Sequence, residues 1–393
     1  MSHLARSIQR VHDLLSVPVS NSTLHHVLND YFRHHREMGS RDRRFFREVA
    51  YTICRIGNAL HELSFQERLA VASFLTGGSL LQQVPELREG RILTLPEPSP
   101  DLENRLGAIL GAYPEFRLEE VFPFADRLSP SVPAEQYIRS LFVQPDVWIR
   151  VRRQQTDLLA EQLSHAGIPF SIHPDFPCSW SVPQGAALDK LSLQTRTAFQ
   201  VQDLASQLVC QSYHPSPGEA WWDLCAASGG KSIALLDSCL DIELLASDVR
   251  PAIVSNLQER LKGSGYDKRE TAVIDAAEEG LDLGRRFDAI LADVPCSGSG
   301  TWSRTPEQLR WFDPNTLERR FHPLQKSILS TATRHLKSGG KIHYSTCSVF
   351  ESENEQLVNW AVDSLGLELV HYSYISRYFD RADTLFLAVL AKS

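Results

Sequence analysis

Two cysteines follow the ends of expected strands in a way that could bring a thiol into an active site. In LADVPCSGSG (291–300) an apolar run ends in Asp293 and a Pro-Cys pair, so that Cys296 precedes a glycine-serine loop. In YSTCS (344–348), Cys347 follows the expected strand KIHYST (341–346). A thiol attacks only when a neighbour lowers its pKa or accepts its proton, and a buried cysteine is otherwise a small apolar side chain. Each is therefore a candidate nucleophile or a structural thiol.

A glycine-rich loop lies upstream of both cysteines. The segment DLCAASGGKS (223–232) ends in GGKS, but Cys225 stands where a phosphate-binding P-loop has its first glycine. The pattern is typical of a strand end, a small-residue loop and a helix start. Backbone amides can approach a ligand closely there, and the helix N-terminus favours a carboxylate. A P-loop nucleotidase rests on GGKS alone and stays open as an alternative.

Three aspartates follow successive apolar runs after this loop. Asp248 lies 18 residues after Gly230, which is the spacing of an acid that binds ribose hydroxyls. Asp275 would border an adenine, and Asp293 ends the run before Cys296. Together with the glycine loop they indicate a cofactor pocket. S-adenosylmethionine fits better than a dinucleotide, because the diphosphate-binding fingerprint is missing.

The elements that must position these residues alternate between strand and helix after residue 205. Expected strands are 220–226, 242–248, 270–276, 287–294 and 340–347, followed by a strand pair at 367–375 and 384–393. This order predicts an α/β class I methyltransferase fold, with a doubly wound, mostly parallel seven-stranded sheet. Ligands bind at the carboxyl ends of such strands. Neighbouring strands lie roughly 5 Å apart, so both thiols can face one pocket.

Three domains are expected along the chain. Residues 1–128 form a helical domain, 129–205 a small α/β lead-in subdomain, and 206–393 the class I domain. The seven arginines between Tyr31 and Gly57 leave two interpretations open, a solvated helix face or a surface that meets RNA phosphates. They are Arg33, Arg36, Arg41, Arg43, Arg44, Arg47 and Arg55.

The composition excludes several classes of protein. The net charge of −8 argues against a strongly basic, nonspecific nucleic-acid binder, although local basic surfaces remain possible. Seven scattered cysteines without a C-x-x-C pair predict neither a disulfide framework nor a metal site. No apolar run approaches the roughly 20 residues that span a bilayer. We expect a cytoplasmic monomer that does not enter the membrane.

Three motifs together resemble one family. DLCAASGGKS, DVPCSGSGTWSRTPEQLRW and YSTCSVFESENE are similar to the successive signatures of the Sun-type (RsmB-like) RNA 5-methylcytosine methyltransferases. FQVQDLASQLV (199–209) resembles the lead-in to the first of these signatures, and the N-terminal helices resemble a NusB-like RNA-binding domain. The chain departs from the family at Ser228, where proline is usual, and at Ser232, where threonine is frequent.

The resemblance implies a cofactor and a covalent mechanism. S-adenosylmethionine would be bound by Asp248 at the ribose, by Asp275 at the adenine side and by Asp293 beside the reacting methyl group. Cys347 would add to carbon 6 of a cytosine, and Cys296 would assist release of the product. The loop that holds the cofactor would consist of Cys225, Ala226, Ala227, Ser228, Gly229, Gly230 and Lys231.

The implied substrate is RNA, with small-subunit rRNA expected first. A tRNA substrate is one alternative. A catalytically weakened RNA-binding factor of ribosome assembly is another, because Ser228 departs from the family pattern and the chain is acidic. The target base must be unpaired or flipped out of its stack. Candidates for RNA contact are Gln202, Asp203, Arg304, Arg310 and Trp311.

Overall fold

The computed structural model describes residues 3–16 and 23–393, which fold into two compact units. The helical unit comprises residues 1–128, 133–144 and 301–313. The sheet unit comprises residues 129–132, 145–300 and 314–393. Within the described ranges, no helix is both long and apolar enough to cross a membrane.

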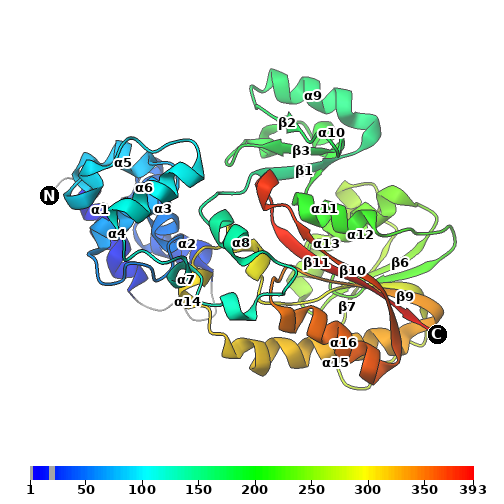
Figure 1. Cartoon of the computed structure of the whole chain (residues 1–393). Helices are drawn as coiled ribbons and strands as arrows, with labels where there is room; N and C mark the ends of the chain where they lie inside the picture. The colour runs from blue at the N-terminus through cyan, green and yellow to red at the C-terminus, as the bar shows by residue number, and fades with distance from the viewer. Residues whose placement is uncertain (1–2, 17–22) are drawn as a thin grey trace. The chain divides into compact units, whose positions relative to one another are not determined.

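The helical unit contains the helices that the N-terminal pattern predicts (Figure 1). The arginine-rich helix α3 begins at Ser40, after Gly39 as its N-cap, and buries Phe45, Val49 and Ile53. The helices are α1 (His3–Leu15), α2 (Leu24–His34), α3 (Ser40–Cys54), α4 (Phe65–Leu75), α5 (Ser79–Gln83), α6 (Leu102–Ala112), α7 (Leu118–Val121), α8 (Ala134–Ser140) and α14 (Gln308–Trp311).

Arg55 corrects one part of the arginine prediction. Its guanidinium is buried and donates a hydrogen bond to the carbonyl of Leu141 at 2.8 Å. Burial lowers the pKa of Arg55 to about 10. Arg68 is buried in the same way and donates to the carbonyls of Gly57 and Ala59. Buried cations with such partners hold backbone segments together, so Arg55 is not available to RNA phosphates.

Residues 301–313 complete the core of the helical unit, although they come from the middle of the chain. The Trp302 ring lies 5.9 Å from that of Phe122 and 5.7 Å from that of Phe124, measured between centroids. Glu307 is 1% exposed and accepts a hydrogen bond from the backbone N–H of Leu24 at 3.0 Å. Sequence periodicity does not reveal such a long-range contribution, because it reports only on neighbours along the chain.

The sheet unit, whose backbone is described throughout, is built on the expected class I methyltransferase sheet of seven strands in the order β10-β11-β9-β8-β5-β6-β7. The five strands from β9 to β7 are mutually parallel, and β11 runs antiparallel to both β9 and β10. Their bounds are β5 (Ala220–Asp223), β6 (Glu243–Asp248), β7 (Glu270–Val273), β8 (Phe287–Asp293), β9 (Leu336–Thr346), β10 (Leu367–Ser376) and β11 (Thr384–Lys392).

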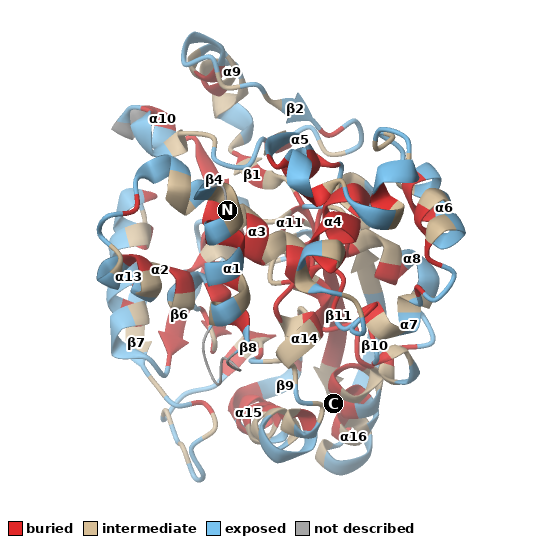
Figure 2. Cartoon of the chain, turned by 90° about the vertical axis from the view of Figure 1, so that its left-hand side faces the viewer, coloured by how far each residue is buried: buried red, intermediate tan, exposed pale blue. Residues whose placement is uncertain are grey.

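Helices cover both faces of this sheet, and its central strands are buried (Figure 2). On one face, α15 (His322–His335) and α16 (Glu355–Leu365) pack on residues of β8 and β9. On the other face lie α11 (Leu204–Gln211), α12 (Gly230–Ser238) and α13 (Pro251–Gly263). Strands that are buried on both faces are continuous apolar runs, which is why the sequence located them.

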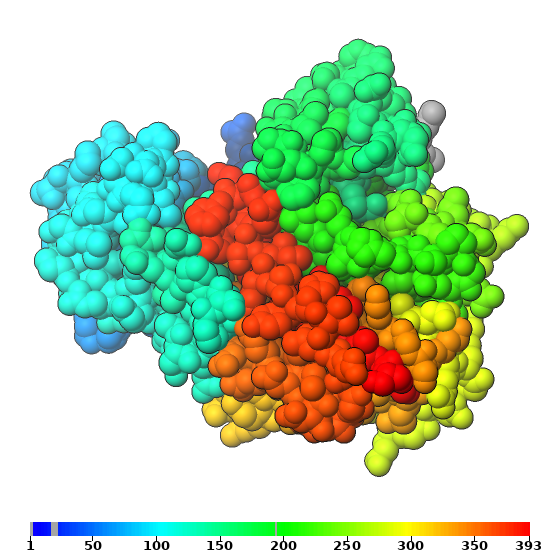
Figure 3. Space-filling view, turned by 45° about the vertical axis from the view of Figure 1, so that its right-hand side comes forward, coloured from blue at the N-terminus to red at the C-terminus, as the bar shows by residue number. Residues whose placement is uncertain are grey.

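A small antiparallel sheet forms a lobe of the same unit (Figure 3). Its order is β2-β3-β1-β4, and α9 (Thr156–His165) and α10 (Leu193–Arg196) accompany it. The strands are β1 (Val147–Val151), β2 (Ser171–Ile172), β3 (Ser179–Val182) and β4 (Phe199–Val201). The first segment of the helical unit ends at Leu128, but the compact units do not follow the order of the chain. Residues 133–144 group with the helices, and residues 145–205 group with the large sheet.

Candidate active site

The two strand-end cysteines lie side by side. Strand β8 ends at Asp293 and its neighbour β9 ends at Thr346, with Asp293 in register with Ser345. The Sγ atoms of Cys296 and Cys347 are 3.4 Å apart. The expected proximity of the two thiols is confirmed. It arises because parallel neighbours end at the same edge of a sheet.

The surroundings of Cys296 favour its protonated form. The hydrogen bond with Cys347 and burial raise the pKa of Cys296 well above its usual value, and the nearby Glu353 carboxylate adds to this effect. Cys296 is therefore a protonated thiol at neutral pH. A protonated thiol is a poor nucleophile but a competent partner for proton exchange with the sulfur beside it.

Glu353 fixes the loop that carries Cys296. Its side chain is fully buried, and its Oε1 accepts from Ser297 N at 2.9 Å and from Gln325 Nε2 at 3.0 Å. Its Oε2 accepts from Ser297 Oγ at 2.5 Å. Gln325 also donates to the carbonyl of Pro295 at 2.9 Å. Glu353 is not evident from the sequence, because an acidic run such as ESENE (351–355) is typical of the exposed first turn of a helix. The signal was the serine-rich loop, whose hydroxyl groups can satisfy a buried acid.

Asp293 has a charged partner from the cofactor loop. Lys231 Nζ lies 2.6 Å from Asp293 Oδ2, and Ser345 Oγ donates to Oδ1 at 2.7 Å. Burial disfavours the Lys231 ammonium, but Asp293 and other nearby groups outweigh it and raise the pKa of Lys231. The Lys231 ammonium of this ion pair therefore stays protonated at neutral pH. The ion pair links the helix start at α12 to the strand end that precedes the thiols.

The loop between β5 and α12 has an unusual backbone. Ala227 has φ +46° and Gly229 has φ +82°, which are left-handed conformations. A Cβ at position 229 would come within 2.4 Å of a methyl group of Leu257, so glycine is required there on two counts. Ala226 N donates to the carbonyl of Ser247 at 2.8 Å. The loop is thereby held against the end of β6.

Asp248 at the end of β6 accepts from the loop and from an arginine. Its Oδ2 accepts from Ala227 N at 3.2 Å, and Arg250 donates to both oxygens at 2.8 and 2.9 Å. Burial opposes ionisation, but the hydrogen bonds from Arg250 and Ala227 outweigh it and lower the pKa of Asp248. Asp275 lies on the exposed loop after β7 and accepts from Ala277 N at 2.9 Å. The assignment of these acids to ribose and adenine stays a prediction.

Asp223 is a further acid that the sequence interpretation did not select. It ends β5, is 1% exposed, and accepts a hydrogen bond from Ser232 Oγ at 2.6 Å. Among the described residues its buried Oδ1 has no hydrogen-bond partner. Burial raises the pKa of Asp223 to about 7. A strand-end acid directly before a glycine loop is the signal that could have identified it.

These groups fit S-adenosylmethionine. The first N–H groups of α12 have no acceptor within the helix and suit a carboxylate. The unpartnered oxygen of Asp223 suits an ammonium group, and the ionised Asp248 suits hydroxyl groups. The side chain of Cys225, a residue expected in the cofactor loop, packs against the apolar core beside the loop.

Two of the expected RNA-contact residues have structural roles instead. Gln202 is buried and its Oε1 accepts from Arg150 Nε at 2.9 Å. Asp203 caps α11 by accepting from Ala205 N, and it also accepts from Asp383 N. Both side chains are therefore committed to folding contacts. The other three candidates, Arg304, Arg310 and Trp311, belong to the helical unit.

A segment of the chain, residues 210–373, is similar to a known protein family. Residues 210–373 match the family described as 16S rRNA methyltransferase RsmB/F. The ribosomal RNA small subunit methyltransferase B of Cronobacter sakazakii is 32% identical over 218 residues, which cover 55% of this chain and 50% of that protein. The chain thus spans about half the length of the curated relatives it matches.

Solved structures share the fold. The crystal structure of the protein PH0851 has a TM-score of 0.70 at 20% identity and covers 100% of both chains. That of NSun6 from Pyrococcus horikoshii with SFG has a TM-score of 0.61 at 18% identity, and covers 70% of this chain and 98% of that one. The family match and the fold agree with the motifs, the strand order and the loop described above. Residues 210–373 are therefore similar to the Sun-type, or RsmB/F, methyltransferases, and this similarity indicates S-adenosylmethionine as the cofactor.

Proposed function

We propose that this protein transfers a methyl group from S-adenosylmethionine to carbon 5 of a cytosine in RNA. The observation that carries the proposal is the pair of thiols 3.4 Å apart, Cys296 and Cys347, next to the Asp293–Lys231 ion pair. An aromatic carbon is a poor methyl acceptor, so a covalent route through a thiol is needed. A second thiol in contact with the first serves a reaction that must also break the covalent bond.

In the proposed mechanism Cys347 is the nucleophile. Its thiolate adds to carbon 6 of the cytosine, and the electron pair of the ring double bond moves to carbon 5. The cofactor supplies an electrophilic methyl group, which carbon 5 takes up. Loss of the proton on carbon 5 then restores the double bond and breaks the bond from carbon 6 to sulfur. Cys347 leaves as the thiolate with which it attacked, so over the whole reaction the one proton released is that of carbon 5.

Cys296 is the group that we assign to this last stage. Its raised pKa keeps it protonated as a resting thiol, and its Sγ is in hydrogen-bond contact with Cys347. To act as the base, Cys296 first gives its proton to solvent; the thiolate then accepts the proton of carbon 5 in the elimination and returns to the resting thiol. Asp293 pairs with Lys231 and is the group that we assign to hydrogen bonding with the ring edge of the cytosine.

The proposed substrate is small-subunit rRNA. The relatives that match over half of the chain are named ribosomal RNA small subunit methyltransferase B. The helical unit also presents exposed arginines on α2 and α3, which suit contacts with phosphates. They are Arg33, Arg41 and Arg44. A tRNA substrate is the alternative that the same chemistry allows.

The test combines methyl transfer with trapping of the covalent complex. The full chain is incubated with labelled S-adenosylmethionine and either small-subunit rRNA or tRNA, and bisulfite sequencing locates the modified base. We expect Cys347→Ala to abolish both methylation and the denaturation-resistant protein–RNA adduct. Cys296→Ala should accumulate the adduct. Cys178→Ala removes a partly buried thiol in the loop before β3 and serves as the matched control.

Two outcomes would contradict the proposal. The reverse pattern of adducts would mean that the roles of Cys296 and Cys347 are exchanged. Cofactor binding without methyl transfer to either RNA would favour the RNA-binding assembly factor over the enzyme.

A further inference from the structure

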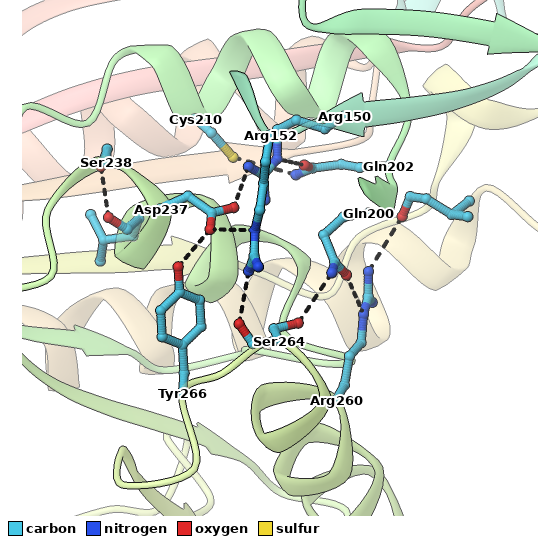
Figure 4. A network of polar contacts seen from close by, with 12 residues as sticks. Arg150, Arg152, Gln200, Gln202, Cys210, Asp237, Ser238, Arg260, Ser264 and Tyr266 are labelled. Atoms are coloured by element: carbon cyan, nitrogen blue, oxygen red, sulfur yellow. Dashed lines mark hydrogen bonds and ion pairs between the residues drawn. The ribbon is translucent and has the colours of Figure 1, made fainter. Parts of the chain in front are cut away.

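One guanidinium joins three segments of the sheet unit. Arg260, near the end of α13, donates from Nη1 to Ser228 Oγ at 2.7 Å and to the Ser228 carbonyl at 3.2 Å. Its Nε donates to Gln200 Oε1 at 3.1 Å, and its Nη2 to the Val201 carbonyl at 3.4 Å. Helix α13, the cofactor loop and strand β4 therefore meet at one side chain. Figure 4 shows Arg260 and Gln200 in this arrangement.

The cofactor loop depends on contacts from outside itself. Ala227 is a non-glycine residue in the left-handed region, at φ +46°. Such conformations persist only where the surrounding structure determines them. Asp248 holds the loop on one side through Ala227 N, and Arg260 holds it on the other through both oxygens of Ser228. The Ser228 hydroxyl is therefore an anchor point and not a free surface group.

The arginine is itself held by a network that extends into the small sheet (Figure 4). Gln200 also donates to Ser264 Oγ at 3.1 Å, and Arg152 donates to the Ser264 carbonyl at 2.9 Å. Arg152 further pairs with Asp237 at 3.0 Å. A planar guanidinium with several fixed partners is more rigid than a lone surface arginine. The small sheet thus fixes the direction from which Arg260 reaches the loop.

We propose that Arg260 is a positioning residue for the cofactor, and that the hydroxyl of Ser228 is the contact through which it acts. The pair sets the backbone of the loop that presents its amides to S-adenosylmethionine. The small sheet thereby contributes to cofactor affinity through Gln200 and Val201. This inference rests on the cofactor of the proposed function, and not on the identity of the methylated base.

The test is a double-mutant cycle on cofactor affinity. Isothermal titration calorimetry of the full chain with S-adenosylhomocysteine, in the absence of RNA, measures Kd for Ser228→Ala, Arg260→Ala and the double variant. Loss of one charge-assisted hydrogen bond corresponds to about a tenfold change in Kd, which we expect for Ser228→Ala. Arg260→Ala should weaken binding at least as much. The double variant should bind no more weakly than Arg260→Ala, because both changes remove the same contact.

A conservative variant and a control separate positioning from folding. Ser228→Thr retains the hydroxyl and should bind within about twofold of the wild type. Arg269 donates to the carbonyls of Ile242 and Leu240, at the other end of β6, and Arg269→Ala should lower Tm without changing Kd. In methyl-transfer assays, Ser228→Ala should raise KM for the cofactor and leave kcat nearly unchanged.

Three results would overturn the inference. These are wild-type affinity in Ser228→Ala, additive losses in the double variant, or a lower Tm for Arg260→Ala with an unchanged Kd. The affinity for S-adenosylhomocysteine is measured without RNA, so it tests the Arg260–Ser228 pair independently of the methylated base. A failure to methylate cytosine would refute the proposed function but would not affect this test.

Discussion

Replacing Asp223 by asparagine tests the electrostatics beneath the cofactor loop. Asp223 is 1% exposed, and burial raises its pKa to about 7 even though Ser232 donates a hydrogen bond to it. An aspartate in the unfolded chain has a pKa of about 4. Between these two values the folded protein holds a proton on this carboxyl group, whereas the unfolded chain has released it. Folding is therefore coupled to pH through this one side chain.

The sign and the size of the effect follow from proton linkage. The native state binds more protons in this window, so the free energy of unfolding falls as the pH rises. The contribution is complete below about pH 4 and is lost as the pH rises through the folded pKa of about 7. A shift of about three pKa units corresponds to roughly 4 kcal/mol, of which about 3 kcal/mol falls between pH 5 and pH 8. Asparagine does not ionise, so between pH 5 and pH 8 the stability of Asp223→Asn should rise by about 3 kcal/mol relative to that of the wild type.

The assay is urea unfolding of the cofactor-free protein at several pH values from about 5 to 8, followed by tryptophan fluorescence. Trp221 and Trp222 directly precede Asp223 and report on its strand. The comparison uses only the change in the free energy of unfolding with pH. The cost of burying the new amide is the same at every pH and therefore cancels. Asp288→Asn on β8 is the matched control. Hydrogen bonds from Lys337 and Ala220 outweigh burial and lower the pKa of Asp288, so that this group stays ionised throughout.

This reasoning would be refuted if the free energies of unfolding of Asp223→Asn and the wild type differed by the same amount at both ends of the pH range. It would mean that the buried carboxyl group is already ionised at the acidic end.

Three further changes address the contacts around the loop and the thiols. Lys231→Met removes the ammonium group 2.6 Å from Asp293 and should lower the free energy of unfolding by about 2 kcal/mol. The rate of methyl transfer should fall at least tenfold. An unaltered rate would show that the ion pair has no part in the mechanism. Glu353→Gln weakens the charged acceptor of Ser297 and should lower kcat about tenfold, whereas calorimetry should give an unchanged cofactor Kd; a changed Kd would contradict its restriction to the thiol loop. Asp237→Asn loosens the ion pairs with two arginines of the small sheet, and limited proteolysis should cut that sheet about tenfold faster; an unchanged rate would show that other contacts hold the lobe.

The strand ends could be predicted because their signal is local. Strand β8 is an apolar run that stops at Asp293, and β9 follows a glycine pair and stops before Cys347. Alternation with helices makes such strands parallel, and parallel strands end at one edge. The meeting of the two thiols follows from these two facts. No contact between distant residues had to be known in advance.

Burial of charged side chains could not be predicted in the same way. Glu353 and Arg55 look like surface residues in a helical pattern, yet both are buried among hydrogen-bond partners. Their partners lie far away in the sequence, 56 residues for Glu353 and Ser297, and 86 for Arg55 and Leu141. Only the folded chain brings such partners together, and without them burial of the charge would be prohibitive.

The origin of residues 301–313 has a consequence for biosynthesis. A ribosome that has released the chain only as far as residue 144 has not yet supplied Trp302 or Glu307, which pack in the helical unit. Until then the aromatic faces of Phe122 and Phe124 that meet Trp302 remain uncovered. Domains usually fold in the order of their synthesis, whereas this N-terminal unit is completed only after more than half of the large sheet's sequence has emerged. The nascent protein therefore carries an unfinished apolar surface through much of its translation.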